Sequence, residues 1–446
     1  MSKSFRPWDV DQVWLLPPSI QDLVPAGHLA HFVRDTVRDG LDLSRIMDSY
    51  GEERGYPPYH PGMMVALLLY GYSRGIYSSR RMATACEERL DVAAVTGMQR
   101  PDFRTISDFR KRHLAALSGL FQQVLKLCRV AGLVKLGHVA LDGTKIKANA
   151  SKHKAMSYGR MKQAEPALAA EVDRWLAEAA ATDEAEDRQF GRDRRGDEMP
   201  AWVADKRKRL EKIREAKAAL EVEARAAAAA KRDGDDAGPS AGSGRAKPGR
   251  KPKPPSPLPA DKAQRNFTDP DSRVLKTKDG FIQGYNAQAA VDGHAQVIVA
   301  QGLTNSTSDQ AQLVPLLDAI KADTGANPEQ ISADAGYCSE ANLRTVARRR
   351  IKGYIATGRQ RHGTAAAVNR RPPRPGSRVA RMAAKLKRAG RRSRYRLRKQ
   401  IVEPVFGQIK QARGFRQFLL RGRDKVRHEW ALICTAHNLG KLAQAA

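Results

Sequence analysis

The feature that most constrains this fold is a short apolar run that ends at an acid. Residues 137–146 read GHVALDGTKI, so aliphatic residues lead directly to Asp142 and a lysine follows closely. Such a run is typical of a buried strand, whereas Asp-Gly after an apolar stretch is also an ordinary hairpin turn. The role of Asp142 therefore depends on whether other carboxylates meet it in the fold.

Before this strand, apolar residues recur at the spacing of helices. Helices are predicted over residues 28–37, 63–72 and 78–90, and a fourth begins at Asp102, which suits a helix cap, and runs towards Leu127. Together they predict an all-α N-terminal domain over residues 1–130. Short helices rich in arginine, including Arg104 and Arg110, fit a helix-turn-helix reader of DNA. A helical bundle whose basic residues simply face solvent is the alternative.

A long insertion, residues 151–266, follows the first strand. Residues 160–231 are rich in Ala, Glu, Arg and Lys with apolar residues at helical spacing, which predicts a helical arm. Residues 232–262 are rich in Gly, Ser, Pro and Lys, which predicts a flexible basic linker without a core. We expect the arm to contact DNA or a second protomer, with a tolerated surface excursion as the alternative.

Strands resume after the insertion and alternate with helices. A hairpin is predicted around Asp292-Gly293, and a later strand over residues 330–337 carries a second acid, Asp334, near its end. Helices are predicted over residues 308–322, 339–350, 395–410 and 424–443, with a strand over 353–357. This order predicts an α/β fold, a mixed sheet with flanking helices, formed by residues 135–150 and 267–446.

Three carboxylates can meet on this scaffold. Asp142 and Asp334 each end a strand, and Glu403 lies on the helix after a block, residues 359–399, that contains no acid and that we expect to stay mobile until an anion binds. If the two strands are neighbours, their carboxyl ends bring the aspartates together, and a helix beside that edge adds the glutamate. Each acid alone also has a structural explanation, as a turn, loop or exposed helix residue.

Clustered carboxylates repel one another unless a cation neutralises them, and hard oxygen ligands select Mg²⁺ or Mn²⁺. Two such ions about 3.5–4 Å apart activate an attacking oxygen and stabilise the leaving oxygen of a phosphodiester. Basic residues surround each acid and are predicted to hold the phosphate backbone: Lys145, Lys147, Arg396, Arg398, Lys399 and Lys410.

The overall charge points to the same partner. The chain carries 79 Lys and Arg against 48 Asp and Glu, a formal net charge of +31 with a pI of about 10.3. Such a charge produces a strong positive field, and nucleic acid is the polyanion that most commonly binds to proteins of this kind. A membrane surface is the rival, but the sequence has no apolar run long enough to span a bilayer, and its start lacks the apolar core of a signal peptide. The four scattered cysteines argue against a disulfide framework and a structural zinc.

Several segments resemble the DDE transposases of bacterial insertion sequences. The resemblance rests on LDGTKIKANAS around Asp142, DGFIQGYNAQAAVD at 279–292, ADAGY around Asp334, VEPVFGQIK around Glu403 and the closing WALICTAHNLGKL. The N-terminal segments YHPGMMVALLLYGYSRGIYSSR and RPDFRTISDFRKRH look like the helical domain that precedes the catalytic core in such enzymes. The resemblance covers most of the chain outside the insertion and the basic block.

The resemblance implies a ribonuclease-H-like catalytic domain in which Asp142, Asp334 and Glu403 bind the metal ions. Its implied chemistry is hydrolysis at the element ends, then strand transfer by the freed 3′-hydroxyl. A related signature, Tyr-x2-Arg-x3-Glu-x6-Lys, fits at Glu403 and Lys410. Lys399 stands where the arginine is expected and Arg396 where the tyrosine is expected, with Tyr395 one residue early.

We therefore expect a cytoplasmic, nucleoid-associated bacterial transposase that acts on double-stranded DNA, both the element ends and the target, as a homodimer in the DNA complex and without membrane contact. A non-catalytic DNA-binding protein derived from a transposase is one alternative. A structure-specific nuclease on the same fold is the other.

Overall fold

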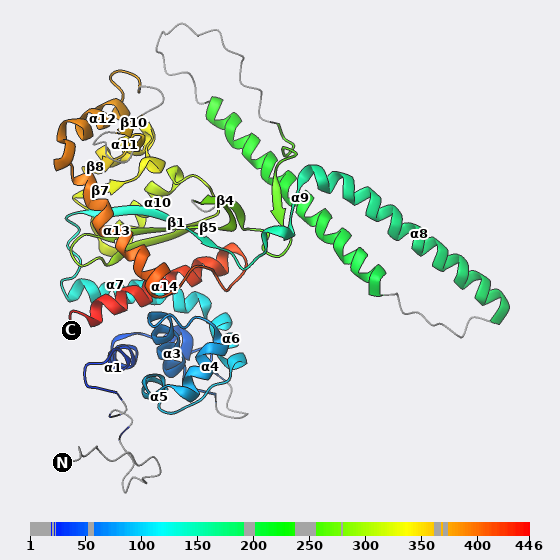
Figure 1. Ribbon diagram of the computed structural model, residues 1–446, viewed down its shortest axis with the longest axis horizontal. Coiled ribbons are helices and arrows are strands. Elements are labelled where there is room, and N and C mark those ends of the chain that lie inside the picture. The colour runs from blue at the N-terminus through cyan, green and yellow to red at the C-terminus, as the bar shows by residue number, and fades with distance from the viewer. Residues whose placement is uncertain are drawn as a thin grey trace, which may run out of the picture.

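The computed structural model describes residues 19, 22, 24–51, 58–190, 201–236, 256–277, 280–360, 367–368 and 373–446. Three parts are visible: a group of short N-terminal helices, a mixed sheet with helices on its faces, and two long helices that project from one side (Figure 1). In the described part of the chain, no helix has the length and apolar character needed to cross a membrane.

The N-terminal part is all helical, as predicted. Its elements are α1 (Leu29–Asp35), the π-helical turn η2 (Thr36–Gly40), α2 (Ser44–Met47), α3 (Pro61–Ser73), α4 (Ser79–Glu88), α5 (Leu90–Thr96), α6 (Phe103–Arg112) and α7 (Leu114–Val130). Asp102 caps α6, because its carboxylate accepts the backbone N–H groups of Arg104 and Thr105 at 2.7 and 3.1 Å.

One prediction in this part is wrong. The helix from Asp102 does not run on towards Leu127, because His113, with φ −102° and ψ 15°, interrupts it between α6 and α7. The break separates the amphipathic helix α6 from α7, which lies beside the sheet and packs along α14 (Arg423–Ala443) (Figure 1). Helical periodicity continues across such a break, so the pattern alone does not reveal it.

The sheet has the order β4-β5-β1-β7-β8, with β6 paired to β5. Its strands are β1 (Val139–Lys147), β4 (Arg273–Thr277), β5 (Gly280–Asp292), β6 (Ile298–Thr304), β7 (Gln330–Ala333) and β8 (Lys352–Ile355). β1 runs antiparallel to β5 and parallel to β7, and β7 runs parallel to β8. The predicted mixed sheet is therefore confirmed, with the first strand beside the strand that carries Asp334.

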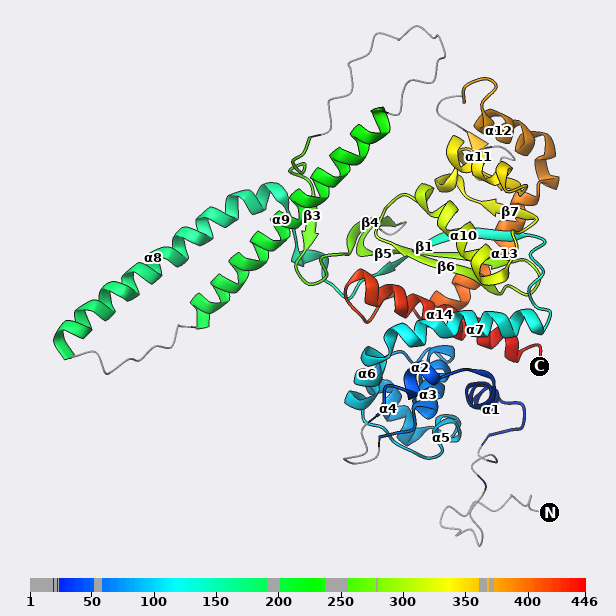
Figure 2. The ribbon, with the colours of Figure 1, turned by 180° about the vertical axis from the view of Figure 1, so that it is seen from behind.

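Helices cover both faces of this sheet. They are α10 (Leu313–Thr324), α11 (Glu340–Arg348), α12 (Arg378–Ala389), α13 (Leu397–Gly407) with the π-helical turn η8 (Gln408–Ala412), and α14. α13 crosses one face over β1, and α10 lies on the other face beside β6 (Figures 1 and 2). One hydrophobic cluster runs from α3 through α7 and α14 into the sheet, so the predicted boundary at residue 130 is a change of element type within a continuous core.

Two expectations for the sheet region need correction. Asp142 does not end its strand: β1 continues to Lys147, and Asp142 pairs across the ladder with Ala289, so Asp142-Gly143 is not a turn. Part of the basic block is not mobile either, because it forms α12, whose Val379 and Met382 pack against the main core. The short pair β9 (Arg359–Gln360) and β10 (Ala367–Val368) lies in the same block.

The projecting pair consists of α8 (Tyr158–Phe190) and α9 (Ala201–Asp236) (Figure 2). It has a small core of its own, formed by Tyr158, Met161, Ile213, Ala216 and Leu220, above the strand pair β2 (Ala155–Ser157) and β3 (Gln264–Asn266). Most of the predicted basic linker, including the segment 249–252, lies outside the described residues.

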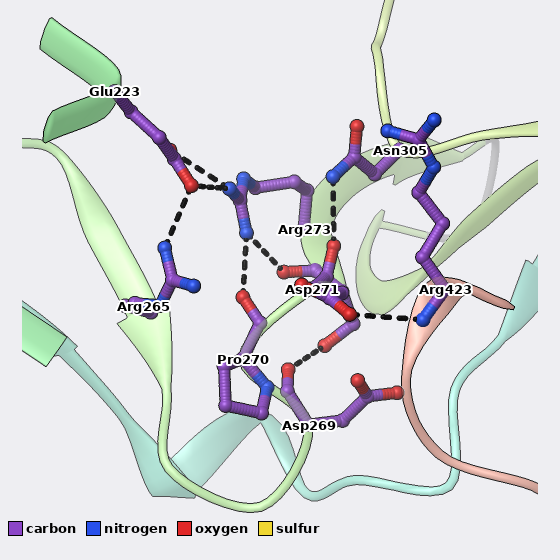
Figure 3. Close-up of polar contacts among 9 residues, drawn as sticks. Glu223, Arg265, Asp269, Pro270, Asp271, Arg273, Asn305 and Arg423 are labelled. Atoms are coloured by element: carbon purple, nitrogen blue, oxygen red, sulfur yellow. Dashed lines mark hydrogen bonds and ion pairs between the residues drawn. The ribbon is translucent and has the colours of Figure 1, made fainter. Parts of the chain in front are cut away.

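An ion-pair cluster ties the base of these helices to the edge of the sheet. Glu223 of α9 accepts two hydrogen bonds from Nη2 of Arg273, on β4, at 2.8 and 2.9 Å, and one from Nη1 of Arg265, on β3, at 2.7 Å (Figure 3). Nη1 of Arg273 also donates to the carbonyl oxygen of Pro270 at 2.8 Å. The arginine thus connects the insertion to the mixed sheet.

Candidate active site

Three predicted acids come from separate elements that meet at one edge of the parallel strands. β7 pairs only with Val139–Leu141 of β1, so Asp142 lies just beyond the end of that ladder. Asp334 follows β7 directly and caps the 3-10 turn η5 (Ala335–Tyr337), accepting the Gly336 N–H at 2.8 Å. Glu403 lies on α13, which packs against β1. The fold therefore supplies the neighbouring strands and the flanking helix on which the sequence argument depended.

Arg398 joins two of these acids. Its Nη1 donates to Oδ2 of Asp142, and its Nη2 lies 3.3 Å from Oε1 of Glu403. The Arg398 side chain is 12% exposed and that of Asp142 15%, so the pair is largely removed from water. Arg398 was predicted to hold DNA phosphate, and in the structure its guanidinium contacts Asp142 and Glu403.

This contact also clarifies the Tyr-Arg-Glu-Lys signature. Tyr395 and Arg398 interact through their side chains and keep the expected two-residue spacing between them. Both stand one residue before the expected positions, so a single extra residue before Glu403 accounts for the departure. The arginine that reaches the acids is Arg398 and not Lys399.

A fourth carboxylate, Asp309, belongs to this cluster and was not predicted. Its Oδ1 accepts hydrogen bonds from Asn286 Nδ2 at 2.6 Å and from Gln288 Nε2 at 2.7 Å, and Tyr337 donates to Oε1 of Gln288. The helix predicted over residues 308–322 begins later than expected, because Asp309 precedes a 3-10 turn, η4 (Gln310–Gln312), and α10 starts at Leu313. The available signal was Asn286 and Gln288, two amides in the buried part of β5.

The electrostatics of the site show a shortage of positive charge. Burial raises the pKa of Asp142 to about 7, and the charges of Asp334 and Asp309 add to the rise, while Arg398 opposes it. Burial and the charge of Asp309 likewise raise the pKa of Asp334. A single guanidinium therefore does not balance the group, which is the condition under which a cation is bound.

The residues provide hard oxygen donors of the kind that Mg²⁺ and Mn²⁺ prefer. Within the described residues, however, no three His, Cys, Asp or Glu side chains stand close enough to hold a metal ion. Arg398 lies between Asp142 and Glu403, so we expect it to shift when a divalent cation takes its place. The donor chemistry fits such an ion, and Arg398 contacts both Asp142 and Glu403 in this structure.

Gly143 gives the site its compactness. A Cβ atom at this position would lie 2.4 Å from Gln288 Nε2, 2.8 Å from Asn286 Oδ1 and 2.9 Å from Asp309 Oδ1. These are the fourth carboxylate, Asp309, and the two amides that donate to it. The space beside Asp142 is therefore open only to glycine.

We expect Gly143→Ala to destabilise the protein by about 1–3 kcal/mol, because the added methyl overpacks the amide network, and to lower catalytic activity as Asp309 is displaced. Gly119→Ala is the matched control, since nothing lies within 4 Å of a Cβ there and the residue is inside α7. Thermal unfolding of both variants, beside the wild type, measures the difference. Equal melting temperatures for the two variants would contradict the crowding at Gly143.

The predicted basic residues are placed differently around the acids. Lys410 reaches towards β1, with Nζ 3.1 Å from Thr144 Oγ1 and 3.3 Å from the Lys145 carbonyl oxygen. Lys145 donates to the carbonyl oxygen of Lys276 at 2.6 Å. Lys147, Arg396 and Lys399 are exposed.

The two arginines singled out in the N-terminal part differ from each other. Arg104 is exposed and lies over the ring of Phe103, 5.7 Å from its centre. Arg110 is 6% exposed, and its guanidinium donates to Tyr72 Oη, the Tyr77 carbonyl oxygen and Ser79 Oγ at 3.0–3.2 Å. Arg110 therefore holds helices together, and its contact with DNA stays a prediction.

The mixed sheet brings Asp142, just beyond the β1–β7 ladder, next to Asp334, directly after β7, as in a ribonuclease-H-like domain. Comparison with known families adds a match to the transposase DDE domain over residues 259–439 and a match to a transposase domain (DUF772) over residues 18–112. No curated protein and no solved structure matches the chain. The chain belongs to the DDE transposases of insertion sequences, a family that binds and recombines DNA.

The matched regions include two of the three acids. Asp334 and Glu403 lie inside the DDE-domain match, whereas Asp142 lies between the two matched regions. The place of Asp142 in the site therefore rests on the pairing of β1 with β7 and on its contact with Arg398.

Proposed function

We propose that this transposase cleaves DNA at the ends of its insertion sequence and joins the freed 3′-ends to target DNA. The observation that carries the proposal is that Asp142 and Glu403, 261 positions apart in the chain, contact one guanidinium just beyond the end of the β1–β7 ladder, beside Asp334. Asp142 loses most of its hydration there, with its side chain 15% exposed, whereas that of Glu403 is 49% exposed; a buried carboxylate carries a desolvation cost that a purely structural surface acid avoids.

In this proposal Asp142, Asp334 and Glu403 hold two Mg²⁺ or Mn²⁺ ions. Bound there, such ions would activate the attacking oxygen and stabilise the leaving oxygen of the phosphodiester. Burial of Asp142 keeps water away from the site and strengthens its electrostatic interactions. Arg398 holds the acids together before the cations bind, and afterwards it is free to contact phosphate.

The basic residues near the acids position the DNA backbone in this proposal. Lys410 has lost part of its hydration, which lowers its pKa, and it is held beside β1 by the oxygens of Thr144 and Lys145. Lys145, Lys147, Arg396 and Lys399 extend the positive surface around it. Arg104, on the exposed side of α6, is the proposed DNA contact of the N-terminal helices.

The assembly and location follow from the same proposal. We infer that double-stranded DNA, as element ends and as target, is the partner, that two copies of the chain act in the DNA complex, and that the protein works in the cytoplasm at the nucleoid. The division into an N-terminal DNA-binding domain, a catalytic domain and an inserted arm stays a prediction, as does contact of the arm with DNA or a second protomer.

A cleavage assay on the DNA that flanks this gene tests the proposal. With Mg²⁺ the wild type is expected to nick the element ends, and neither an unrelated duplex nor the same DNA with a chelator is expected to be cut. Binding of the end DNA without cleavage in Mg²⁺ or Mn²⁺ would favour the non-catalytic alternative. Cleavage that follows branched structure and ignores the end sequence would favour the structure-specific nuclease.

A further inference from the structure

A second basic site lies beside the candidate active site, between α12 and the outer strand β8. It is a pocket of about 590 Å³, lined by five cationic side chains and one aromatic ring: Arg381, Lys385, Arg388, Arg392, Arg394 and Tyr354. No acidic residue lines it. None of these residues was predicted to bind DNA.

The cations of this pocket have no carboxylate partners among the described residues. Lys385 is held in place, since Nζ donates to the Gly353 carbonyl oxygen at 2.9 Å and lies 4.1 Å from the centre of the Tyr354 ring. Burial and the neighbouring charge of Lys352 lower the pKa of Lys385. Arg381, Arg388 and Arg394 are exposed and form no ion pair with the described part of the chain.

The local structure concentrates this charge on one side of α12. Arg381, Lys385 and Arg388 follow one another at i, i+4 and i+7, so they share a helix face, whereas Val379 and Met382 pack into the core. Like charges at this spacing oppose helix formation. An anion in the pocket would remove that repulsion.

A direct structural connection leads from the pocket to the acids. Arg394 begins the 3-10 turn η7 (Arg394–Arg396), which packs on β7 and β8, and α13 starts at the next residue, Leu397. Arg398, which binds Asp142 and Glu403, is thus four residues from Arg394. His138, at the start of β1, stacks on Tyr354 with ring centres 6.2 Å apart, so the wall of the pocket continues into the catalytic strands.

We propose that this pocket binds a backbone phosphate of the DNA near the position that is cut. The inference rests on the proposed function, since it takes DNA as the ligand. Arg381, Arg388, Arg392 and Arg394 supply donors in the planar, bidentate form that suits phosphate oxygens. Lys385 adds a fixed point charge at the base of the pocket. The site thereby sets where the strand lies relative to the acids.

The other large pocket of the described structure makes a useful contrast. It lies at the base of the arm, has a volume of about 750 Å³, and includes Glu223, Arg273 and Arg423. There Glu223 already neutralises Arg273 (Figure 3). Of these two pockets among the described residues, the one beside α12 gathers cations without an internal acid, so phosphate is assigned there.

The test compares end-DNA binding by the wild type and by Arg381→Ala/Arg388→Ala over a range of salt concentrations. Each lost phosphate contact is expected to reduce the slope of log K against log salt by about 1, and affinity near 0.1 M salt is expected to fall about tenfold. The charge-preserving pair Arg381→Lys/Arg388→Lys should keep most of the slope. Lys126→Ala/Lys321→Ala, which removes two exposed lysines from α7 and α10, should bind as the wild type does.

DNA carrying single uncharged methylphosphonate linkages locates the contact. For the wild type, one or two positions near the cleavage site should weaken binding, and the alanine pair should be insensitive at those same positions. Identical affinities, salt slopes and methylphosphonate profiles for wild type and alanine pair would overturn the inference. So would calorimetry in which the alanine pair loses affinity for inorganic phosphate while its DNA binding is unchanged, because the ligand would then be free phosphate.

These outcomes separate the inference from the proposed function. Suppose that the binding of end DNA depends more steeply on salt for the wild type than for the alanine pair, but that the wild type never cleaves. The proposed activity is then wrong, and the inference about the pocket is supported. If the wild type cleaves and the alanine pair is indistinguishable from it in binding, only the pocket inference is wrong.

Discussion

Asp142→Asn is expected to slow cleavage of the element ends by about 10³-fold or more while leaving affinity for the same DNA nearly unchanged. The reason is that the carboxylate is proposed to hold cations worth several kcal/mol of transition-state stabilisation, and each 1.36 kcal/mol is a factor of ten in rate. Asparagine keeps the shape of the side chain at its place on β1. Single-turnover cleavage and a separate binding titration measure the two quantities.

The same result is expected for Asp334→Asn and Glu403→Gln, because all three acids are assigned to one site. Asp318→Asn is the matched control: this aspartate lies on α10, is 61% exposed and pairs with Arg349 at the surface. Its variant should cleave at the wild-type rate. Wild-type rates for the three site variants would show that the acids have been misassigned.

Arg398→Ala is expected to lower the free energy of unfolding by about 2–3 kcal/mol in metal-free buffer. Removing one partner of a largely buried ion pair leaves the other charge uncompensated, and here Asp142 would face Asp334 and Asp309 without a cation. Mg²⁺ should raise the melting temperature of this variant more than that of the wild type, because the guanidinium no longer competes for the acids. Chemical denaturation and melting curves with and without Mg²⁺ measure both effects.

Lys111→Ala provides the comparison for that variant. Lys111 and Asp108 form a surface pair with both side chains more than 60% exposed, so the change should cost less than about 1 kcal/mol. In the double variant Asp142→Asn/Arg398→Ala, the loss should be smaller than the sum of the single losses, since the two residues act on each other. An Arg398→Ala protein as stable as the wild type, with an equal response to Mg²⁺, would contradict the proposed role of Arg398.

Much of the catalytic part was predictable because its signals are local. Apolar runs ending near Asp142 and Asp334, and the turn at Asp292-Gly293, give the strands and their order. The pairing of β1 with β7 was the uncertain step, since parallel partners are joined by long connections and leave no local pattern. The continuation of β1 to Lys147 was missed because Asp-Gly usually marks a turn, whereas here the glycine gives room for Asn286, Gln288 and Asp309.

The errors in the site share a physical cause. Sequence gives the charge of a side chain but not what it faces. Arg110 and Arg104 stand six residues apart on one helix, yet one is buried among tyrosines and the other is exposed. Arg398 was grouped with the phosphate contacts although it faces two acids, and Asp309, which faces the site, fell inside a predicted helix. Such assignments depend on tertiary contacts.

The most direct test of the central claim replaces the leaving 3′-oxygen of the scissile phosphodiester at the element end with sulfur. If divalent cations held by Asp142, Asp334 and Glu403 stabilise that leaving atom, cleavage should be strongly slowed in Mg²⁺ and largely restored by Mn²⁺, which accepts softer ligands. The oxygen substrate should be cut in both ions. Equal slowing of the sulfur substrate in Mg²⁺ and Mn²⁺, with the oxygen substrate cut normally, would contradict the claim that a cation at these acids carries the cleavage.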